Sequence, residues 1–307
     1  MDTCTDQPDE TPPPRGLWLP LITPFRDGAI DAASLRRLIA HYARAPLDGL
    51  ILGATTGEGL TLNEDELERL VALTADALAA SGRKLPVYLG LSGSDTRKLT
   101  KALQRTERWP VDGVLIACPY YTRPSQQGLV LHFEAAADAT ARPILIYNIP
   151  YRTGVNLQNE AMLRLAERAN IVGVKDCCAD PAQTAELLRL RPPGFAVLTG
   201  EDALAYDALH RGCDGAILAS AHLETEAFAA MMHRLQAGDR LGGATEWQRL
   251  ADLPKLLFAE PSPAPVKYAL WRRGLIDSPE VRLPMTPVSP ALAATLDARI
   301  LPGRSAA

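Results

Sequence analysis

The 307-residue sequence lacks several features that mark specialised classes of protein. No apolar run approaches the roughly 18 residues of a membrane span, and the first six residues lack the apolar core of a signal peptide. Acidic and basic residues are interspersed and the net charge is −4, which gives no footprint for nucleic acid. We therefore expect a soluble, cytoplasmic protein that binds neither nucleic acid nor membrane.

Cysteine and histidine are scarce, and neither has an informative spacing. The five cysteines are odd in number and lack a framework pattern, which is typical of a reducing compartment. The five histidines fall mostly on predicted helices and lack the spacing of metal ligands. Since there is also no P-loop, and no Gly-x-Gly-x-x-Gly after the first predicted strand, we expect neither a metal nor a cofactor.

The sequence does contain a regular alternation of short apolar strands and amphipathic helices. The predicted strands are residues 17–22, 49–53, 85–91, 113–117, 143–147, 171–175, 195–198 and 215–219. A helix is predicted after each strand, and this α/β pattern is typical of a closed parallel (β/α)8 TIM barrel. A doubly wound open sheet is the alternative, but it rarely needs eight such units.

The segments that flank the predicted barrel differ from it in composition. Residues 1–15 are polar and proline-rich, so we predict a disordered tail there. The barrel is expected to occupy residues 16–238. Beyond it the strand pattern stops, and helices predicted at 250–258, 266–273 and 290–299 indicate a small C-terminal helical domain over residues 239–307. A soft linker is expected around residues 238–243.

The predicted strand at residues 171–175 ends in Lys175. Burying an ammonium disfavours its charged form, so the pKa falls and the free amine becomes a nucleophile. Such an amine can form a Schiff base with a carbonyl substrate. The alternative is a strand-end lysine whose ammonium reaches water. The residues that end the other strands decide between these two interpretations.

Polar residues follow several of the other predicted strands, at the barrel end where chemistry takes place. Thr55 and Thr56 follow the second strand and suit a bound carboxylate, although threonines here can also just cap the next helix. Tyr121 follows the fourth strand and Tyr147 ends the fifth. A phenol can relay protons, but tyrosine is more often an ordinary rim residue.

Three further candidates fall at the same rim. Arg152 follows the fifth strand, where its guanidinium could hold a substrate carboxylate in bidentate fashion or form a surface salt bridge. Gly200 lies in a loop after the seventh strand, and the acidic residues of that loop argue against a phosphate site. Ile217 lies on the eighth strand. A lysine, two tyrosines, a threonine and an arginine at one rim favour a catalytic site over separate structural roles.

Four motifs resemble those of the dihydrodipicolinate synthase (4-hydroxy-tetrahydrodipicolinate synthase) family. They are Thr-Thr-Gly-Glu at 55–58, Pro-Tyr-Tyr-Thr-Arg-Pro-Ser-Gln at 119–126, Tyr-Asn-Ile-Pro-Tyr-Arg-Thr-Gly at 147–154 and Gly-Val-Lys-Asp at 173–176. The resemblance continues through 260–267 and 282–287, so it covers nearly the whole chain after the tail. This family belongs to the pyruvate-dependent class I aldolases, together with N-acetylneuraminate lyase.

The resemblance implies a condensation of pyruvate with L-aspartate 4-semialdehyde, a step of lysine and diaminopimelate biosynthesis. Lys175 would form the Schiff base with pyruvate, and Tyr147 would donate and accept protons. Thr55 and Tyr121 would complete a hydroxyl relay, with Tyr121 reaching into the site of a neighbouring subunit. The resemblance also implies a homotetramer, built as a dimer of dimers.

The resemblance assigns the remaining candidates to substrate binding. Thr56 and the backbone at Ile217 would hold the pyruvate carboxylate, with Gly200 beside them, and Arg152 would take the carboxylate of the aldehyde. The Thr-Thr loop and Arg152 favour the synthase over N-acetylneuraminate lyase. Keto-deoxy-sugar dehydratase, 4-hydroxy-2-oxoglutarate aldolase and a non-catalytic binding barrel stay open as alternatives.

Some positions depart from the pattern of the family's lysine-sensitive bacterial members. Those members have histidines where this chain has Glu64 and Leu67, and they have asparagine and glutamate where it has Ser94 and Lys98. A Lys98 ammonium would repel a lysine effector. We therefore predict that lysine does not inhibit this protein.

Overall fold

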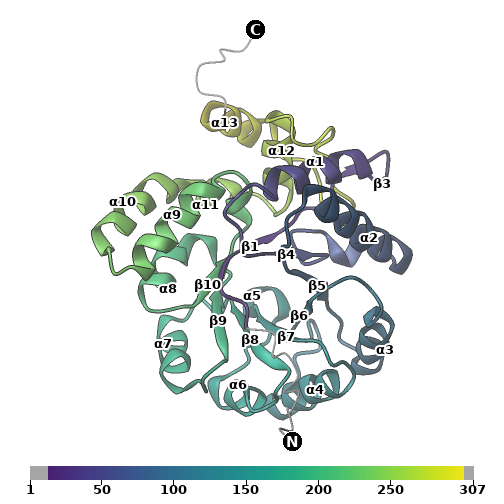
Figure 1. Cartoon of the computed structure of the whole chain (residues 1–307), viewed down its shortest axis with the longest axis vertical. Coiled ribbons are helices and arrows are strands. Elements are labelled where there is room, and N and C mark those ends of the chain that lie inside the picture. Colours follow the sequence, from purple (N-terminus) through teal and green to yellow (C-terminus); the bar gives the residue numbers. More distant parts are fainter. Residues whose placement is uncertain (1–12, 301–307) are drawn as a thin grey trace, which may run out of the picture.

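Eight parallel strands close into a barrel in the computed structural model, which describes residues 13–300 of the chain (Figure 1). The strands are β1 (Gly16–Pro20), β4 (Gly49–Leu52), β5 (Val87–Leu91), β6 (Gly113–Ala117), β7 (Ile144–Asn148), β8 (Ile171–Asp176), β9 (Ala196–Thr199) and β10 (Gly215–Ile217). Around the barrel they follow the order β1-β10-β9-β8-β7-β6-β5-β4. The predicted TIM barrel is confirmed, whereas residues 1–12 of the predicted tail lie outside the described residues.

Helices follow the strands and, apart from the short α5 over one end, cover the outside of the barrel (Figure 1). They are α1 (Ala32–Tyr42), α2 (Glu64–Ser81), α3 (Thr96–Thr106), α4 (Gln126–Asp138), α5 (Pro150–Thr153), α6 (Asn159–Leu165), α7 (Pro181–Leu190), α8 (Ala205–His210) and α9 (Thr225–Gln236). Side-chain caps fix several of their starts, because an N-cap oxygen satisfies backbone N–H groups that lack a partner within the helix. Asn63 and Glu66 form a capping box at the start of α2.

Short elements occupy the connections that follow four of the strands. The hairpin β2 (Phe25–Arg26) and β3 (Ala29–Ile30) follows β1, and the 3₁₀ turns are η1 (Gly59–Thr61), η2 (Asp202–Leu204) and η3 (Ala219–His222). The first strand ends at Pro20 and not at Ile22 as predicted: the N–H of Leu21 still donates to the carbonyl of Ile51 in β4, but the N–H of Ile22 turns to Nε2 of His222.

The strands separate two apolar layers, since successive residues of a strand point to opposite faces. Leu17 and Leu19 of β1 pack in the large core between strands and helices. Trp18, between them, belongs to a second cluster of buried residues inside the barrel, where its ring lies edge-on to Tyr88 at 4.9 Å. The barrel interior is therefore a packed core.

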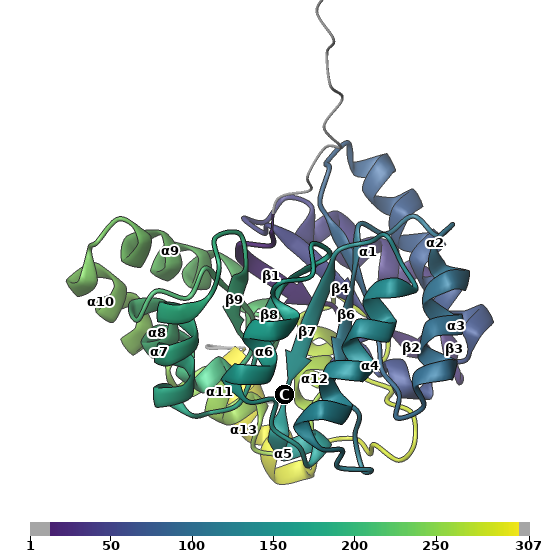
Figure 2. The same cartoon turned by 90° about the horizontal axis from the view of Figure 1, so that it is seen from below.

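The C-terminal helices pack on one end of the barrel. They are α10 (Arg240–Leu250), α11 (Asp252–Leu257), α12 (Ala264–Arg272) and α13 (Pro290–Ile300). Helices α11 and α12 contact η3, which follows β10, and Figure 2 shows α11, α12 and α13 at the same end as α5. The three predicted C-terminal helices are found, but the expected linker is wrong, because α10 begins at Arg240 and packs beside α9.

Candidate active site

The candidate nucleophile Lys175 lies near the end of β8 and is buried, with 5% of the residue exposed. It pairs in register with Tyr147 of β7, and its Nζ lies 4.2 Å from the centroid of the Tyr147 ring. Burial lowers the pKa of the Lys175 ammonium below its ordinary 10.5, although the negative charges of Asp202 and Glu201 act in the opposite direction. A lysine that reaches water is therefore not what the structure shows.

One cavity at the strand ends brings together seven of the eight candidate residues. It is lined by Thr55, Thr56, Tyr147, Arg152, Lys175, Gly200 and Ile217. The eighth candidate, Tyr121, lies outside it but lines an adjoining cleft of 930 Å³, which also includes Thr55 and Arg152. The Tyr121 residue is 91% exposed. Strand counting alone thus located a single site.

Tyr147 is placed to exchange protons next to the amine. Burial raises the pKa of its phenol well above 10, and hydrogen bonding with Thr55 and the charge of Arg152 lower it only partly. The phenol therefore keeps its proton at neutral pH and can donate it to a group held near Lys175. The structure places Thr55 on the solvent side of this pair, where it is exposed.

Gly200 is needed to accommodate the lysine side chain. A Cβ at this position would lie 2.3 Å from Cε of Lys175 and 2.5 Å from Sγ of Cys177. Its N–H donates to the carbonyl of Asp176 at 2.9 Å, which joins the ends of β8 and β9. Any larger side chain would displace the amine, so this glycine shapes the site through its missing Cβ.

A buried ion pair holds the loop that carries Thr55 and Thr56, and the sequence analysis missed it. Glu58 has left-handed backbone geometry (φ 53°), and its N–H donates to the carbonyl of Thr55. Its carboxylate lies 2.5 Å from Nζ of Lys267 in α12 and accepts the N–H of Arg282 at 2.9 Å. Lys267 and Arg282 both lie in segments that carry the family resemblance, 260–267 and 282–287, so the sequence did mark them as candidates.

Two carboxylates follow β9, and they differ in their surroundings. Asp202 is buried and accepts the N–H groups of Ser220 and Ala219. Glu201 is half-buried, and its Oε1 is buried without a hydrogen-bond partner in the described part of the chain. Burial raises the pKa of both carboxyl groups, and the charge of Lys175 lowers it. The sequence analysis assigned Gly200 of this loop to substrate binding but gave these two carboxylates no role.

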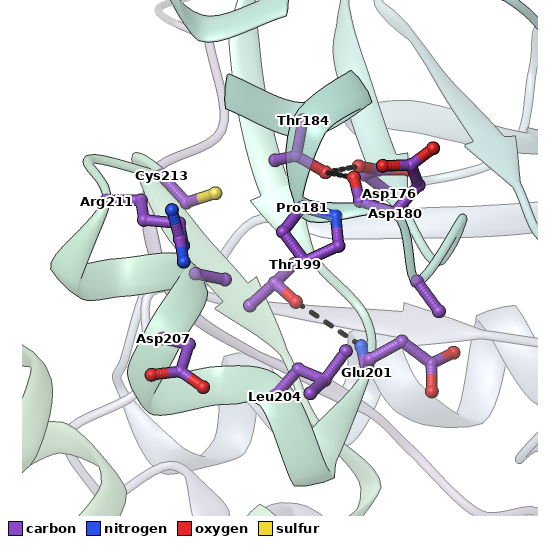
Figure 3. Close-up of a pocket in the computed structure, with 12 residues that line it drawn as sticks. Asp176, Asp180, Pro181, Thr184, Thr199, Glu201, Leu204, Asp207, Arg211 and Cys213 are labelled. Carbon is purple, nitrogen blue, oxygen red and sulfur yellow. Dashed lines mark hydrogen bonds between the residues drawn. The ribbon is translucent and has the colours of Figure 1, made fainter. Parts of the chain in front are cut away.

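Another cavity, of 80 Å³, lies on the other side of this loop, between α7 and α8. There Oγ1 of Thr184 donates to Oδ2 of Asp176 at 2.7 Å, which steadies the end of β8 next to Lys175 (Figure 3). Figure 3 also shows the Glu201 carboxylate pointing away from Cys213. Residues around this cavity therefore help to hold the end of the strand that carries Lys175.

Residues 13–300 contain no group of His, Cys, Asp or Glu side chains that could hold a metal ion. Within the same range, no helix is long and apolar enough to cross a membrane.

The barrel, with a buried lysine and a buried tyrosine at its catalytic end, defines a class I lyase that works through a Schiff base. The model of the Dihydrodipicolinate synthetase family matches residues 13–300, and the chain belongs to that family. The resemblance inferred from the motifs is thereby confirmed.

Individual relatives agree with this assignment. The chain is 44% identical to 4-hydroxy-tetrahydrodipicolinate synthase 2 of Clostridium acetobutylicum, across 89% of this chain and 95% of the relative. Among solved structures, dihydrodipicolinate synthase from Aquifex aeolicus superposes with a TM-score of 0.89 at 31% identity, covering 93% of this chain and 97% of that one. A monomeric dihydrodipicolinate synthase variant gives 0.88 at 34% identity, covering 92% and 94%.

Proposed function

We propose that this protein condenses pyruvate with L-aspartate 4-semialdehyde to give 4-hydroxy-tetrahydrodipicolinate. The observation that carries the proposal is the buried amine of Lys175, 4.2 Å from the Tyr147 ring, in a cavity that Arg152 also lines. The names of the relatives support the same reaction. Lysine and diaminopimelate biosynthesis is the pathway this activity serves.

The chemistry begins when Nζ of Lys175 attacks the keto carbon of pyruvate and water leaves. The resulting iminium draws electrons from the neighbouring methyl group, which loses a proton to give an enamine. The enamine carbon then attacks the aldehyde carbon, and the aldehyde oxygen takes up a proton. Tyr147 handles these protons, with Thr55 as its relay partner, and such acid–base help is typically worth about 10²–10⁴-fold in rate.

Substrate binding is divided between two parts of the rim. Thr56 and the backbone at Ile217 hold the pyruvate carboxylate, and Gly200 leaves room for the imine formed on Lys175. Arg152 holds the carboxylate of the aldehyde. Its guanidinium lies 5.4 Å from the centroid of the Tyr151 ring and lines the cavity of Lys175 as well as the two larger clefts beside it.

Tyr121 is proposed to act in the site of a second subunit, within a homotetramer that is a dimer of dimers. Its N–H donates to the carbonyl of Thr153, so its left-handed backbone (φ 70°) is anchored while the side chain extends outward. An exposed tyrosine beside a catalytic cleft suits such a contact. The cytoplasm is the proposed location, since the substrates are small metabolites.

The Schiff base is tested by trapping it. Borohydride reduction in the presence of pyruvate should leave a stable mass increase on the peptide that contains Lys175, because the reduced imine no longer hydrolyses. Lys175→Arg keeps the positive charge and should give no adduct. An unmodified wild-type peptide would overturn the proposed chemistry and favour a non-catalytic barrel.

The second substrate is tested by competition among aldehydes. Aspartate semialdehyde, N-acetylmannosamine and substrates of keto-deoxy-sugar enzymes should be compared with pyruvate-loaded enzyme. Aspartate semialdehyde should give the highest kcat/KM, and Arg152→Ala should raise its KM because a bidentate charged contact is lost. Unchanged turnover of aspartate semialdehyde by Arg152→Ala would contradict the assignment of Arg152.

A further inference from the structure

Glu201 lines a cavity of 820 Å³ that opens beside the Lys175 site. The walls of this cavity include Tyr151 and Arg152 on one side, Gly200 and Glu201 on another, and residues of α11. Glu201 lies two positions after the end of β9, and its N–H bonds to Oγ1 of Thr199, so the backbone is fixed to the barrel. A cation and an anion thus line one cavity next to the nucleophile.

The carboxylate of Glu201 differs from the other carboxylates of this cavity because only the neutral side chains of Cys177 and Tyr151 approach it as donors, and neither reaches its Oε1. Asp202 accepts two backbone N–H groups, and Oε2 of Glu260 accepts the N–H of Ser289. In residues 13–300, Glu201 forms no ion pair, and its Oε1 is buried without a hydrogen bond. Leaving such a group unsatisfied costs free energy, so it is suited to a ligand that brings a positive charge.

We propose that Glu201 binds the α-ammonium group of the aldehyde substrate while Arg152 binds its α-carboxylate. This inference rests on the proposed function and deepens it. An α-amino acid carries both charges on one carbon, so it needs a cation and an anion on the walls of the same cavity. Sugar aldehydes and plain keto acids lack the ammonium and would leave the carboxylate unpaired, which makes Glu201 a specificity-determining residue.

Glu201 lies near enough to the reacting amine for the charges of Glu201 and Lys175 to shift each other's pKa. Its side chain points away from Cys213 (Figure 3), and Cys177, next to the Lys175 strand end, is buried beside it. Asp202 lines both the Lys175 cavity and the larger cavity, whereas Glu201 lines only the larger of these two, so Glu201 is the carboxylate placed for the second substrate.

The test compares two aldehydes that differ only in the amine. Kinetics with L-aspartate 4-semialdehyde give KM, and succinate semialdehyde, which lacks the ammonium, gives an inhibition constant against it. Glu201→Gln should raise the KM for aspartate semialdehyde about tenfold to a hundredfold, the range for losing a charged hydrogen bond. The inhibition constant of succinate semialdehyde should change less than twofold.

Glu260→Gln is the matched control. It removes the same charge from the wall of the same cavity, but its carboxylate already has a partner, so KM should stay within twofold of wild type. Glu201→Asp keeps the charge on a shorter side chain and should recover part of the loss. Borohydride trapping of pyruvate at Lys175 should be equal in all variants, which shows that they fold and form the imine.

The outcomes separate this inference from the proposed function. An equal rise for both aldehydes, or an unchanged KM in Glu201→Gln, would overturn the ammonium contact. If wild type traps pyruvate but does not turn over aspartate semialdehyde, the proposed function fails at its second substrate, and the Glu201 inference falls with it. Loss of discrimination in Glu201→Gln with normal wild-type turnover supports both.

Discussion

Replacing Lys267 with methionine tests how the C-terminal helices hold the substrate loop. Lys267 lies in α12, its side chain is 0% exposed, and its Nζ is 2.5 Å from Oε1 of Glu58. The ammonium also donates to the carbonyl of Glu280 at 2.7 Å and lies 4.1 Å from the centroid of the Phe25 ring. This cluster joins α12 and the segment after it to the loop that contains Thr55.

The expected destabilisation follows from which charge the substitution leaves behind. Burial lowers the pKa of Lys267 to about 8 even though Glu58 acts to raise it, so removal from water outweighs the attraction of the pair. Methionine removes the cation but leaves the Glu58 side chain, 2% exposed, as an unpaired anion. We expect Lys267→Met to lose about 3–5 kcal/mol of unfolding free energy.

The double variant Lys267→Met/Glu58→Gln identifies the cause. Glutamine removes the unpaired charge and keeps an oxygen that can accept the N–H of Arg282. Because replacing a whole buried pair is often close to neutral, the double variant should be more stable than Lys267→Met alone. This non-additivity is the signature of a direct interaction.

Urea unfolding followed by circular dichroism gives the free energies, and steady-state kinetics give the KM for pyruvate. KM should rise in Lys267→Met, because Glu58 donates its N–H to Thr55 within the same loop. The reasoning is refuted if Lys267→Met unfolds within about 1 kcal/mol of wild type, the lower limit of what losing such a partner costs, or if the double variant is the less stable one.

Four further predictions concern the catalytic end. Gly200→Ala should prevent pyruvate trapping, because its Cβ would lie 2.3 Å from Cε of Lys175, whereas Gly93→Ala, with open space around it, should trap normally; equal trapping would contradict this packing. Tyr147→Phe should lower kcat about 10²–10⁴-fold while trapping persists, and an unchanged kcat would exclude the phenol as the proton carrier. The rate of pyruvate trapping should rise with pH as Lys175 loses its proton and level off below pH 10.5, since burial lowers that pKa; a rise that continues past 10.5 would show an ordinary amine. Sub-millimolar lysine should leave activity unchanged because of the charge on Lys98, and inhibition there would overturn the predicted insensitivity.

The barrel could be predicted because each strand is a short apolar run that is visible in the local sequence. Helix α10 could not be predicted in this way. Its first half contains Gly242 and Gly243, which were interpreted as part of a linker. In the structure a Cβ on Gly243 would lie 2.6 Å from Leu235 of α9. The glycine therefore reflects close packing of two helices, and sequence alone does not distinguish that from flexibility. The division of the chain at residues 238 and 239 stays a prediction.

The same limit applies to the site. Rim residues such as Lys175 and Arg152 could be located by counting strands, because parallel strands bring their ends to one side of a barrel. The pairing of Glu58 with Lys267 joins residues more than 200 positions apart, and no local pattern encodes it. The unpaired state of Glu201 depends likewise on neighbours from other elements.

The C-terminal helices matter to the chemistry because they help to keep water from the amine. Phe258 and Ser262, which lie between α11 and α12, line the same cavity as Lys175. Since burial is the largest influence on the pKa of Lys175, groups that cover the cavity contribute to lowering it. The barrel therefore positions the nucleophile, and the C-terminal helices, anchored through Lys267, supply part of the environment that makes it reactive.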